Sequence, residues 1–262
     1  MNEVNKTLFI PLYGKAAVSK KNIILKDPQA EKIWHKEAFP LHGKSKSKWL
    51  AYNMAMRARV FDDWTEKMLK TYPDATVVHI GCGLDSRCLR VKAPCLHWLD
   101  CDLPDVINVR KMYYQENDTY HMMSIDASDP AKVQSLPENR CGIIILEGLS
   151  MYLSPSQLHN LFQVLSEKYD TLSVLMDIYT VFGAKASKYK NPINDVGVTK
   201  VYGIDDIDEI INGLPLSFTK EYSFTPDYLI NELDFFERMI FKLLFQNSFY
   251  RKIYRLIELS SK

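Results

Sequence analysis

Short apolar runs alternate with longer amphipathic stretches through the middle of the chain. The runs are rich in valine, isoleucine and leucine, and glycine or polar residues follow them. Continuous apolar runs of this length are typical of strands buried on both faces of a parallel sheet. The stretches between them carry helix-start signals or helical spacing, so the pattern predicts successive strand–helix units. The helices predicted between the strands are residues 84–91, residues 104–116 and, capped by Ser154, residues 155–169. The five strands predicted in this part of the chain are residues 76–80, 97–102, 119–125, 142–146 and 171–179.

The pattern becomes less regular after the fifth strand. Residues 182–200 are mixed in character and predict a long connection, which inside a compact domain usually serves as a lid or a binding loop. A short acidic helix is predicted at 204–212, followed by strand 216–224, helix 227–245 and strand 250–259. The aromatic and basic residues near the last helix suit either a membrane surface or packing on the sheet, and we favour packing. The whole pattern predicts an α/β fold with a seven-stranded mixed sheet and helices on both faces, in which the first five strands are parallel and the last is antiparallel.

Helices rather than strands are predicted before the first strand. Asp27 is placed to cap a helix that starts at Pro28, because proline is favoured in the first turn. Residues 49–70 lack glycine and proline and repeat large apolar residues at helical spacing, which predicts a long helix with one buried face. Residues 1–26 carry few periodic signals. The basic run 44–48 predicts a solvated loop, with a flexible flap over the site as the alternative.

Composition and charge exclude several kinds of protein. The 262 residues are 47% hydrophobic, which is ample for a core, and the net charge of +1 provides no general attraction to nucleic acid. No apolar run approaches the roughly 20 residues needed to span a bilayer, and the first apolar run is too short for a signal peptide. The five cysteines show no metal-binding spacing, so we expect reduced thiols, no bound metal and a cytoplasmic location.

A glycine turn directly follows the first predicted strand. Gly81 and Gly83 flank one small residue, which lets the backbone turn sharply and approach a ligand without a Cβ in the way. Asp100 and Asp102 end the next strand about twenty residues later, where a carboxylate can accept hydrogen bonds from both hydroxyls of a ribose. A dinucleotide site would have a third glycine where Ser86 stands. The pattern therefore favours an adenosine ligand without phosphates, of which S-adenosylmethionine is the common one.

Polar residues also follow the third and fourth predicted strands. Residue chemistry alone makes Asp126 a turn-forming or capping aspartate. Glu147 ends the most apolar run of the chain, where a carboxylate without partners would be costly, so it is a candidate site residue. Tyr152 is a weak catalytic candidate, since a buried aromatic side chain on a turn explains it equally well. His79 and His121 lie inside strands and are interpreted as core residues, so the sequence indicates no general base.

Four sequence blocks resemble the leucine carboxyl methyltransferase family, which includes many bacterial small-molecule O-methyltransferases. IGCGLDSR is similar to the family's LGAGLDTR turn, and WLDCDLPDVINVRK is similar to its (F/Y)EVDLPEVI..K block. LEGLSMYL is similar to EGVLMYL, and the upstream RARVFDD is similar to RTRxIDD. The blocks keep the family's order over residues 54–153, with mild departures at Cys82, Ser86 and Asp100.

The resemblance implies a Rossmann-like class I methyltransferase fold that binds S-adenosylmethionine and releases S-adenosylhomocysteine. It implies a single methyltransferase domain over residues 1–262, with an N-terminal helical cap (1–72), a cofactor-binding core (73–179) and a lid segment with the last strands and helices (180–262). The expected activity is O-methylation of a small-molecule carboxylate or hydroxyl. A non-catalytic nucleotide-fold binding protein, a protein carboxyl methyltransferase and a dehydrogenase are the alternatives. Neither the methyl acceptor nor the oligomeric state follows from the sequence.

The resemblance also implies which residues hold the methionine and ribose parts of the cofactor. Arg57 occupies the place of an arginine that reaches the methionine carboxylate, and a guanidinium suits a carboxylate through two parallel hydrogen bonds. Asp102 stands directly before a Leu-Pro pair, as the family's ribose-binding acid does. Gly81 and Gly83 form the turn against which the cofactor lies.

The adenine part is expected at the end of the third strand. There the Asp126 carboxylate is expected to accept a hydrogen bond from the exocyclic amine. The Ala127 amide is expected to donate one to a ring nitrogen. Glu147, at the end of the fourth strand, completes the implied cofactor-binding residues.

Overall fold

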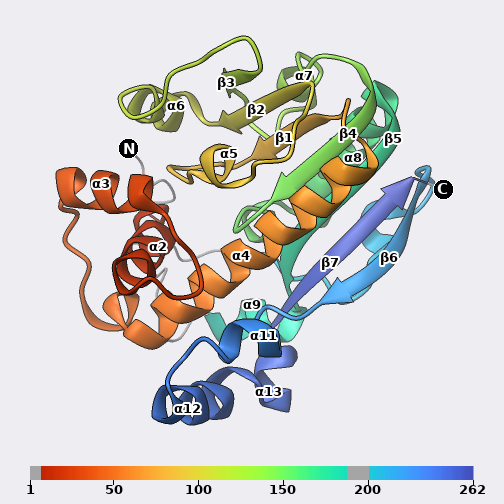
Figure 1. The fold of residues 1–262 in the computed structure, drawn as a ribbon. Helices are drawn as coiled ribbons and strands as arrows, with labels where there is room; N and C mark the ends of the chain where they lie inside the picture. The colour runs from red at the N-terminus through yellow and green to blue at the C-terminus, as the bar shows by residue number, and fades with distance from the viewer. Residues whose placement is uncertain (1–6, 188–200, 262) are drawn as a thin grey trace.

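A seven-stranded sheet runs through the molecule, with helices packed against both of its faces (Figure 1). The computed structural model describes residues 7–187 and 201–261. All seven predicted strands are present, with bounds that differ from the prediction by a few residues. The strands are β1 (Thr76–Ile80), β2 (His97–Asp102), β3 (Tyr120–Ser124), β4 (Asn139–Leu146), β5 (Tyr169–Tyr179), β6 (Leu216–Tyr222) and β7 (Tyr254–Ser261).

The helices vary in length from single turns to one long helix that crosses the sheet. Those of two turns or more are α2 (Phe9–Lys21), α3 (Pro28–Glu37), α4 (Lys48–Thr71), α6 (Pro104–Arg110), α8 (Pro155–Lys168), α9 (Val181–Ser187) and α12 (Phe235–Phe245). Single turns are α5 (Arg87–Arg90), α7 (Pro130–Val133), α10 (Asp208–Ile211), α11 (Asp227–Ile230) and α13 (Ser248–Arg251), with 3₁₀ helices at Gly43–Lys46 and Ser150–Tyr152.

The strands are ordered β3-β2-β1-β4-β5-β7-β6 across the sheet. Strands β1 to β5 are parallel and β7 is antiparallel to both of its neighbours, which confirms the predicted mixed sheet. The chain continues from β1 to one side through β2 and β3, and returns to β4 on the other side. At such a switch point the loops that follow the strands diverge and leave a crevice for a ligand.

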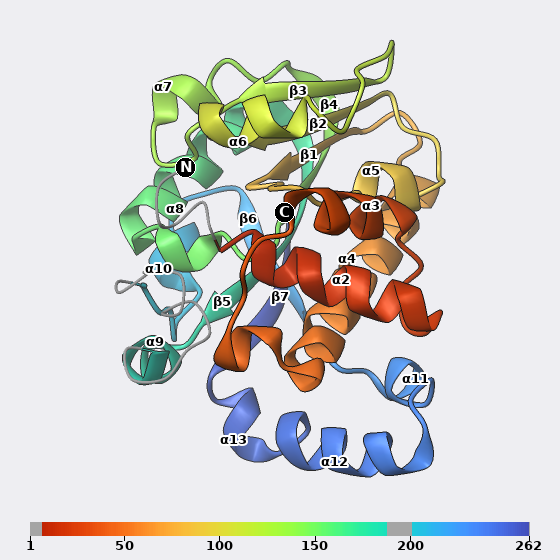
Figure 2. The same cartoon turned by 90° about the vertical axis from the view of Figure 1, so that its left-hand side faces the viewer.

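Alternate residues of the central strands pack into two separate hydrophobic cores, one on each face of the sheet. Val77 of β1 packs on the same side as Met56 of α4, whereas Val78 packs on the side of Leu161 of α8. Adjacent strand residues point to opposite faces, so strands that are apolar throughout require cover on both sides. Figure 2 shows the strands between α4 and α8.

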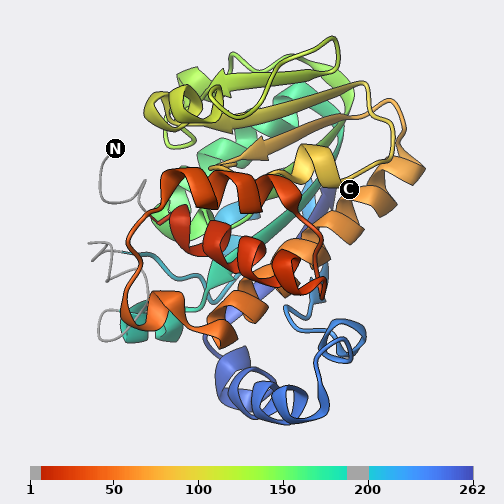
Figure 3. The ribbon, with the colours of Figure 1, turned by 60° about the vertical axis from the view of Figure 1, so that its left-hand side comes forward.

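Helix α2 is the main element that the sequence pattern does not predict. It packs against α3 and α4, beside the edge of the sheet where the parallel strands end (Figure 3). Gly14 of α2 comes close to α4, because a Cβ on it would lie 3.2 Å from the backbone of Ala51. A helix buried on most sides has no polar face, and therefore no one-sided periodicity to detect. Its buried apolar residues are Phe9, Ile10, Leu12, Ala16 and Val18.

Several predicted helices are shorter than expected or divided. The helix expected directly after the glycine turn is the single turn α5, and the helix that starts at Pro104 ends at Arg110. The helix predicted at 227–245 is divided into α11 and α12, because Asp234 accepts a hydrogen bond from the Glu237 amide and starts a new helix. Of the predicted connection at 182–200, the first residues belong to α9, and residues 188–200 lie outside the described residues.

Gly142 allows β4 to pass under an aromatic ring. A Cβ at this position would lie 2.6 Å from Cγ of Tyr169, a residue that is 1% exposed. Gly142→Ala should therefore lower the free energy of unfolding by about 1–3 kcal/mol, the usual cost of overpacking. Denaturant unfolding of Gly142→Ala, Tyr169→Leu and the double variant tests this cause. The double variant should lose less stability than the sum of the single variants, and strict additivity would contradict the steric explanation.

Candidate active site

A cavity of about 930 Å³ lies where the parallel strands end, covered by α2 and α4. Its walls come from the loops after β1 to β5, from both helices and from the segment before β7. All eight residues singled out from the sequence line it. They are Arg57, Gly81, Gly83, Asp102, Asp126, Ala127, Glu147 and Tyr152.

The glycine turn after β1 has the backbone conformation that the sequence predicts. Gly81 and Gly83 have φ angles of +73° and +53°, in the left-handed region where side chains are disfavoured. A Cβ on Gly81 would also lie 3.0 Å from the side chain of Leu149. The Gly83 amide donates a hydrogen bond of 2.7 Å to Oδ2 of Asp102, which fixes the turn to the end of β2.

The two aspartates of β2 have different surroundings. Asp102 lines the cavity and accepts hydrogen bonds of 2.7 Å from the amides of Gly83 and Leu103, and burial raises the pKa of this carboxyl. Asp100 is fully buried and pairs with Arg110, whose guanidinium is fully buried as well. Burial acts to raise the pKa of Asp100, but Arg110 and His79 outweigh it and hold it at about 2. Asp100 therefore stabilises the fold, and Asp102 is the acid that faces the cavity.

Asp126 forms the local turn that its residue type suggests. Its Oδ1 accepts from the amide of Ser128 at 2.9 Å and from the hydroxyl of Ser128 at 2.7 Å. Asp126 and Ala127 also line the cavity, beside Ile125. The turn holds this carboxylate at the cavity wall, so the turn-forming role does not exclude contact with a ligand.

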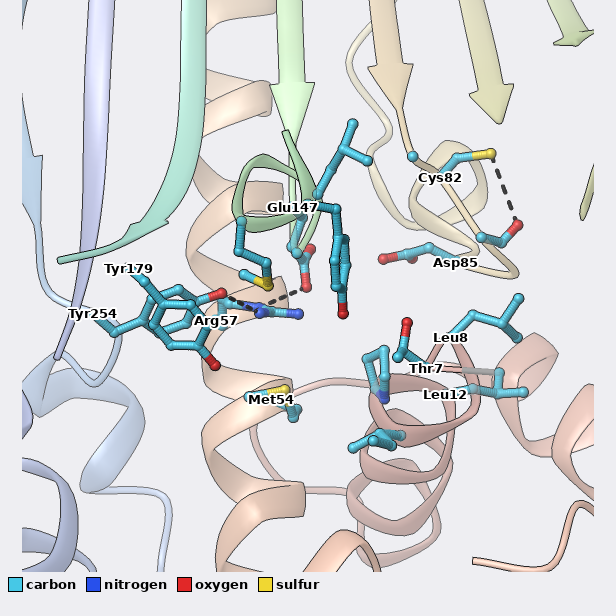
Figure 4. Close-up of a pocket in the computed structure, with 18 of the residues that line it drawn as sticks. Thr7, Leu8, Leu12, Met54, Arg57, Cys82, Asp85, Glu147, Tyr179 and Tyr254 are labelled. Carbon is cyan, nitrogen blue, oxygen red and sulfur yellow. Dashed lines mark hydrogen bonds and ion pairs between the residues drawn. The ribbon is translucent and has the colours of Figure 1, made fainter. Parts of the chain in front are cut away.

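Arg57 is buried at the centre of an ionic network (Figure 4). Its Nε donates to Oε1 of Glu147 at 3.0 Å, and its Nη1 donates to Oδ2 of Asp177 and to the hydroxyl of Tyr254, both at 2.9 Å. Among the described residues, no hydrogen-bond partner reaches Nη2, which lies beside Gly148. The expected pairing with a ligand carboxylate through two parallel hydrogen bonds would need two guanidinium nitrogens. Nε and Nη1 are already bonded within the protein. Only Nη2 is available to a ligand.

Glu147 holds two arginines in place. Arg57 contacts one of its oxygens, and Nη2 of Arg87 donates to the other. Burial acts to raise the pKa of Glu147, but Arg57 and Arg87 outweigh it and lower it to about 2. The ionised carboxylate therefore links α4, the glycine turn region and the end of β4.

Three further charged residues complete the site and were missed from the sequence. Lys15 of α2 donates to Oδ2 of Asp85 at 2.6 Å, and both side chains line the cavity although they are almost completely buried. Burial acts to raise the pKa of Asp85, but Arg90 and Lys15 hold it well below its usual range. Asp177 is an acid near the end of an apolar strand. The criterion that selected Glu147 would have found Asp177, whereas no local signal marks Lys15.

Aromatic side chains form the part of the cavity that lies across from the glycine turn. Figure 4 shows Tyr179, Tyr254 and Met54 on the side opposite Cys82 and Asp85. The rings of Tyr179 and Tyr254 are 4.8 Å apart. The remaining aromatic residues lining the cavity are Trp49, Tyr152, Phe245 and Tyr250.

No strong base is present in this aromatic part of the cavity among the described residues. Burial raises the pKa of Tyr152 to about 12, so its hydroxyl is neutral at pH 7. His79 lines the cavity at the end that contains the glycine turn, where burial lowers its pKa and Arg87 lies 3.2 Å away. This arrangement suits an acceptor that needs no deprotonation inside the site.

No helix within the described ranges is long and apolar enough to cross a membrane. No cluster of three or more metal-binding side chains was found in those ranges. All five cysteines are free thiols.

Comparisons with known proteins identify a family and relatives of this chain. A family model described as leucine carboxyl methyltransferase matches residues 9–166. The tetracenomycin polyketide synthesis O-methyltransferase TcmP of Streptomyces glaucescens is 31% identical over 172 residues, which cover 65% of this chain and 64% of the relative. The S-adenosyl-L-methionine-dependent methyltransferase dpfgK of Gibberella zeae is 28% identical over 189 residues, covering 66% of this chain and 63% of the relative. Each alignment thus spans less than two thirds of the relative.

Solved structures share the fold at low sequence identity. A putative methyltransferase from Thermobifida fusca has a TM-score of 0.60 and 13% identity, covering 97% of this chain and 94% of its own. The magnesium protoporphyrin IX methyltransferase of Synechocystis, solved with bound SAH, has a TM-score of 0.53 and 11% identity, covering 90% of this chain and 94% of its own. These similarities confirm the predicted Rossmann-like methyltransferase fold.

Proposed function

The chain belongs to the leucine carboxyl methyltransferase family, and on that premise we propose that it is an S-adenosylmethionine-dependent O-methyltransferase. Its acceptor in this proposal is a carboxylate or hydroxyl of a small molecule. The observation that carries the proposal is that all seven predicted cofactor residues line one cavity at the carboxyl edge of the sheet. The five free thiols support a cytoplasmic location, because structural disulfides are rare there.

The ribose and adenine would lie along the ends of β1 to β3. Asp102 uses one hydrogen bond on each carboxylate oxygen for the amides of Gly83 and Leu103. A carboxylate has about four acceptor positions, so two remain for the two ribose hydroxyls. Gly81 and Gly83 keep the turn free of side chains, and Asp126 and Ala127 are placed at the wall for the adenine edge.

The methionine carboxylate would lie near Arg57 and Lys15. Nη2 of Arg57 is the donor left available there, and Lys15 lines the same cavity in its ion pair with Asp85. Glu147 and Asp177 hold the Arg57 guanidinium in one orientation, which lowers the entropy cost of binding an anion. When bound, S-adenosylmethionine supplies the activated methyl group.

The aromatic part of the cavity would hold the acceptor. Aromatic rings such as those of Tyr152 and Tyr179 line this part and exclude water. Burial raises the pKa of Tyr152 to about 12, so its phenol provides no proton acceptor at pH 7. A carboxylate acceptor is already ionised and needs no base, whereas an ordinary hydroxyl does. The site therefore supports a carboxylate or an acidified hydroxyl. The name of TcmP places it in polyketide synthesis, which supports a small molecule over a protein chain end.

Ligand-induced stabilisation and product detection test the proposal. S-adenosylmethionine at about 100 times its Kd should stabilise the protein by about 2.7 kcal/mol in a thermal unfolding assay, and NADH should not. Incubation with a panel of aromatic carboxylates and phenols should then release S-adenosylhomocysteine, detected by mass spectrometry. Protection by NADH alone would support a dehydrogenase instead. Binding without turnover on small molecules or peptides ending in a free carboxylate would support a non-catalytic binding protein.

A further inference from the structure

Helix α12 exposes a continuous apolar face. The helix lies at the edge of the molecule, away from the sheet (Figures 1 and 2). The exposed fractions of its outer side chains reach 72% for Phe235 and 75% for Leu243. The neighbouring Phe249 of α13 is 58% exposed. We define the α12 face by the helix residues Phe235, Phe236, Met239, Ile240, Leu243 and Leu244.

The opposite side of α12 packs against α4 and combines phenylalanine with charged residues. Phe241 is fully buried and its ring lies 6.5 Å from that of Tyr52 of α4. Glu237 turns inward and accepts hydrogen bonds from Tyr52 and Lys48. At 3.6 residues per turn, the α12 face covers roughly half of the helix circumference. The apolar side of α12 thus faces outward, whereas the side that packs on the protein includes the charged residues Glu237 and Arg238. A surface helix normally has the reverse arrangement, so the α12 face lacks the cover that its composition indicates.

The size of this surface matches what one subunit of a dimer buries. With roughly 150–250 Å² for a whole aromatic side chain, the α12 face and Phe249 expose on the order of 700 Å² of apolar surface. Monomeric proteins rarely expose more than a few hundred, and a stable interface buries about 800 Å² on each partner. We propose that the α12 face binds the α12 face of a second copy of this chain, related by a two-fold axis.

The charges around the α12 face favour a second copy over a membrane. A helix that lies on a membrane carries an excess of lysine and arginine beside its apolar face. Here Lys242 is 3.6 Å from Asp227, and Asp234 is exposed at the start of the helix. An antiparallel pair would bring the start of one α12, with Asp234, to the end of the other, with Lys242. Arg238, the other basic residue of α12, donates to the backbone carbonyls of Asn231 and Leu233. The opposite charges at the two ends of α12 therefore suit self-association better than binding to anionic lipid.

The proposed interface also borders the cavity. Leu244 belongs to the α12 face and lines the cavity, and the next residue, Phe245, lines it too. The second copy would therefore cover the outer rim of the aromatic part of the cavity. This inference rests on the surface alone and is independent of the proposed activity.

Sedimentation velocity of the full chain tests the proposal. The unchanged protein should be a dimer at micromolar concentration. The variant Phe236→Glu/Leu243→Glu should be a monomer, with the dimer Kd raised by about 100-fold or more, because central apolar residues of an interface each contribute strongly. The matched control is Leu89→Glu/Met112→Glu, which charges two apolar residues that are 48% and 59% exposed elsewhere. The control should remain a dimer, and circular dichroism should show that both variants are folded.

Three outcomes would overturn the proposal. The first is a monomeric protein at concentrations up to about 100 μM, well above the Kd expected for an interface of this area. The second is a dimer that the Phe236→Glu/Leu243→Glu variant leaves intact, or that the control disrupts equally. The third is a monomer that floats with vesicles of anionic phospholipid, which would identify the α12 face as a membrane contact.

Discussion

Arg57→Ala is expected to lower the free energy of unfolding by about 3–5 kcal/mol, the usual cost of breaking a buried ion pair. The guanidinium is the partner of two buried carboxylates, Glu147 and Asp177, which would be left in the protein interior. Thermal unfolding should show a decrease of about 10 °C in Tm. An arginine dedicated to the cofactor could be removed without damage to the fold, so this loss of stability would identify Arg57 as a structural residue as well.

The same substitution separates the structural role of Arg57 from its proposed contact with the cofactor. If Nη2 binds the methionine carboxylate, Arg57→Ala should weaken S-adenosylmethionine by about 2 kcal/mol or more. Decarboxylated S-adenosylmethionine lacks the partner group and should lose much less. Calorimetry with both ligands, below the lowered Tm, makes the comparison. Equal losses for the two ligands would show that Arg57 acts through the fold only.

Two conservative variants provide controls for Arg57. Arg57→Lys keeps the charge, but one ammonium cannot reach the three partners of the guanidinium, so stability should be only partly restored. Tyr254→Phe removes the hydroxyl that accepts from Nη1 and donates to the Asp177 carboxylate, and it leaves both ion pairs in place. It should cost about 1.5–3 kcal/mol of stability and leave the preference for the carboxylate-bearing ligand unchanged.

Asp100→Ala and Asp102→Ala are expected to have opposite consequences although the residues are two positions apart on β2. Asp100→Ala would leave the fully buried Arg110 without its carboxylate, and should cost about 3–5 kcal/mol of stability. Asp102→Ala should instead weaken S-adenosylmethionine by about 1.5–3 kcal/mol, the range for hydrogen bonds to a charged group. Its effect on stability should be smaller, because its two partners are backbone amides at the edge of the cavity.

Each variant serves as the control for the other, because both replace an aspartate of β2 by alanine. Urea unfolding gives the stability of each variant, and calorimetry gives its affinity for S-adenosylmethionine. Asp100→Ala, if it folds at low temperature, should bind the cofactor nearly as well as the unchanged protein. Normal cofactor affinity in Asp102→Ala would remove the ribose assignment, whatever its stability.

Patterns in neighbouring residues account for most of the fold that could be predicted. Buried parallel strands are apolar throughout, so β1 and β4 are evident in the sequence, and Asp27 and Ser154 cap their helices as residue chemistry indicates. Helix α2 was not predicted, because it is buried on most sides and shows no amphipathic period. The division between α11 and α12 was not predicted either, because a single capping aspartate, Asp234, outweighs a continuous apolar pattern.

The residues of the site could be predicted more fully than their contacts. The family's sequence blocks place Asp102 and Glu147 at strand ends, and parallel strands bring such ends to one edge. The ion pairs of the site join distant parts of the chain: Lys15 pairs with Asp85, 70 positions away, and Arg57 pairs with Asp177, 120 positions away. No local pattern encodes such pairs. The sequence therefore indicated Arg57 as a ligand-binding residue, and only the structure shows how much of it the protein itself occupies.

The position of β7 has a kinetic consequence. It is the last of the seven strands along the chain, yet it lies between β5 and β6. Until β7 inserts, the 11-residue strand β5 is an open edge that can pair with other chains. Tyr254 of β7 also contacts Arg57, 197 positions earlier, and contacts this distant in sequence form slowly. Closure of the sheet and assembly of the cavity are thus one late step of folding, and a chain that has formed β1 to β5 but not β7 is the species most exposed to aggregation.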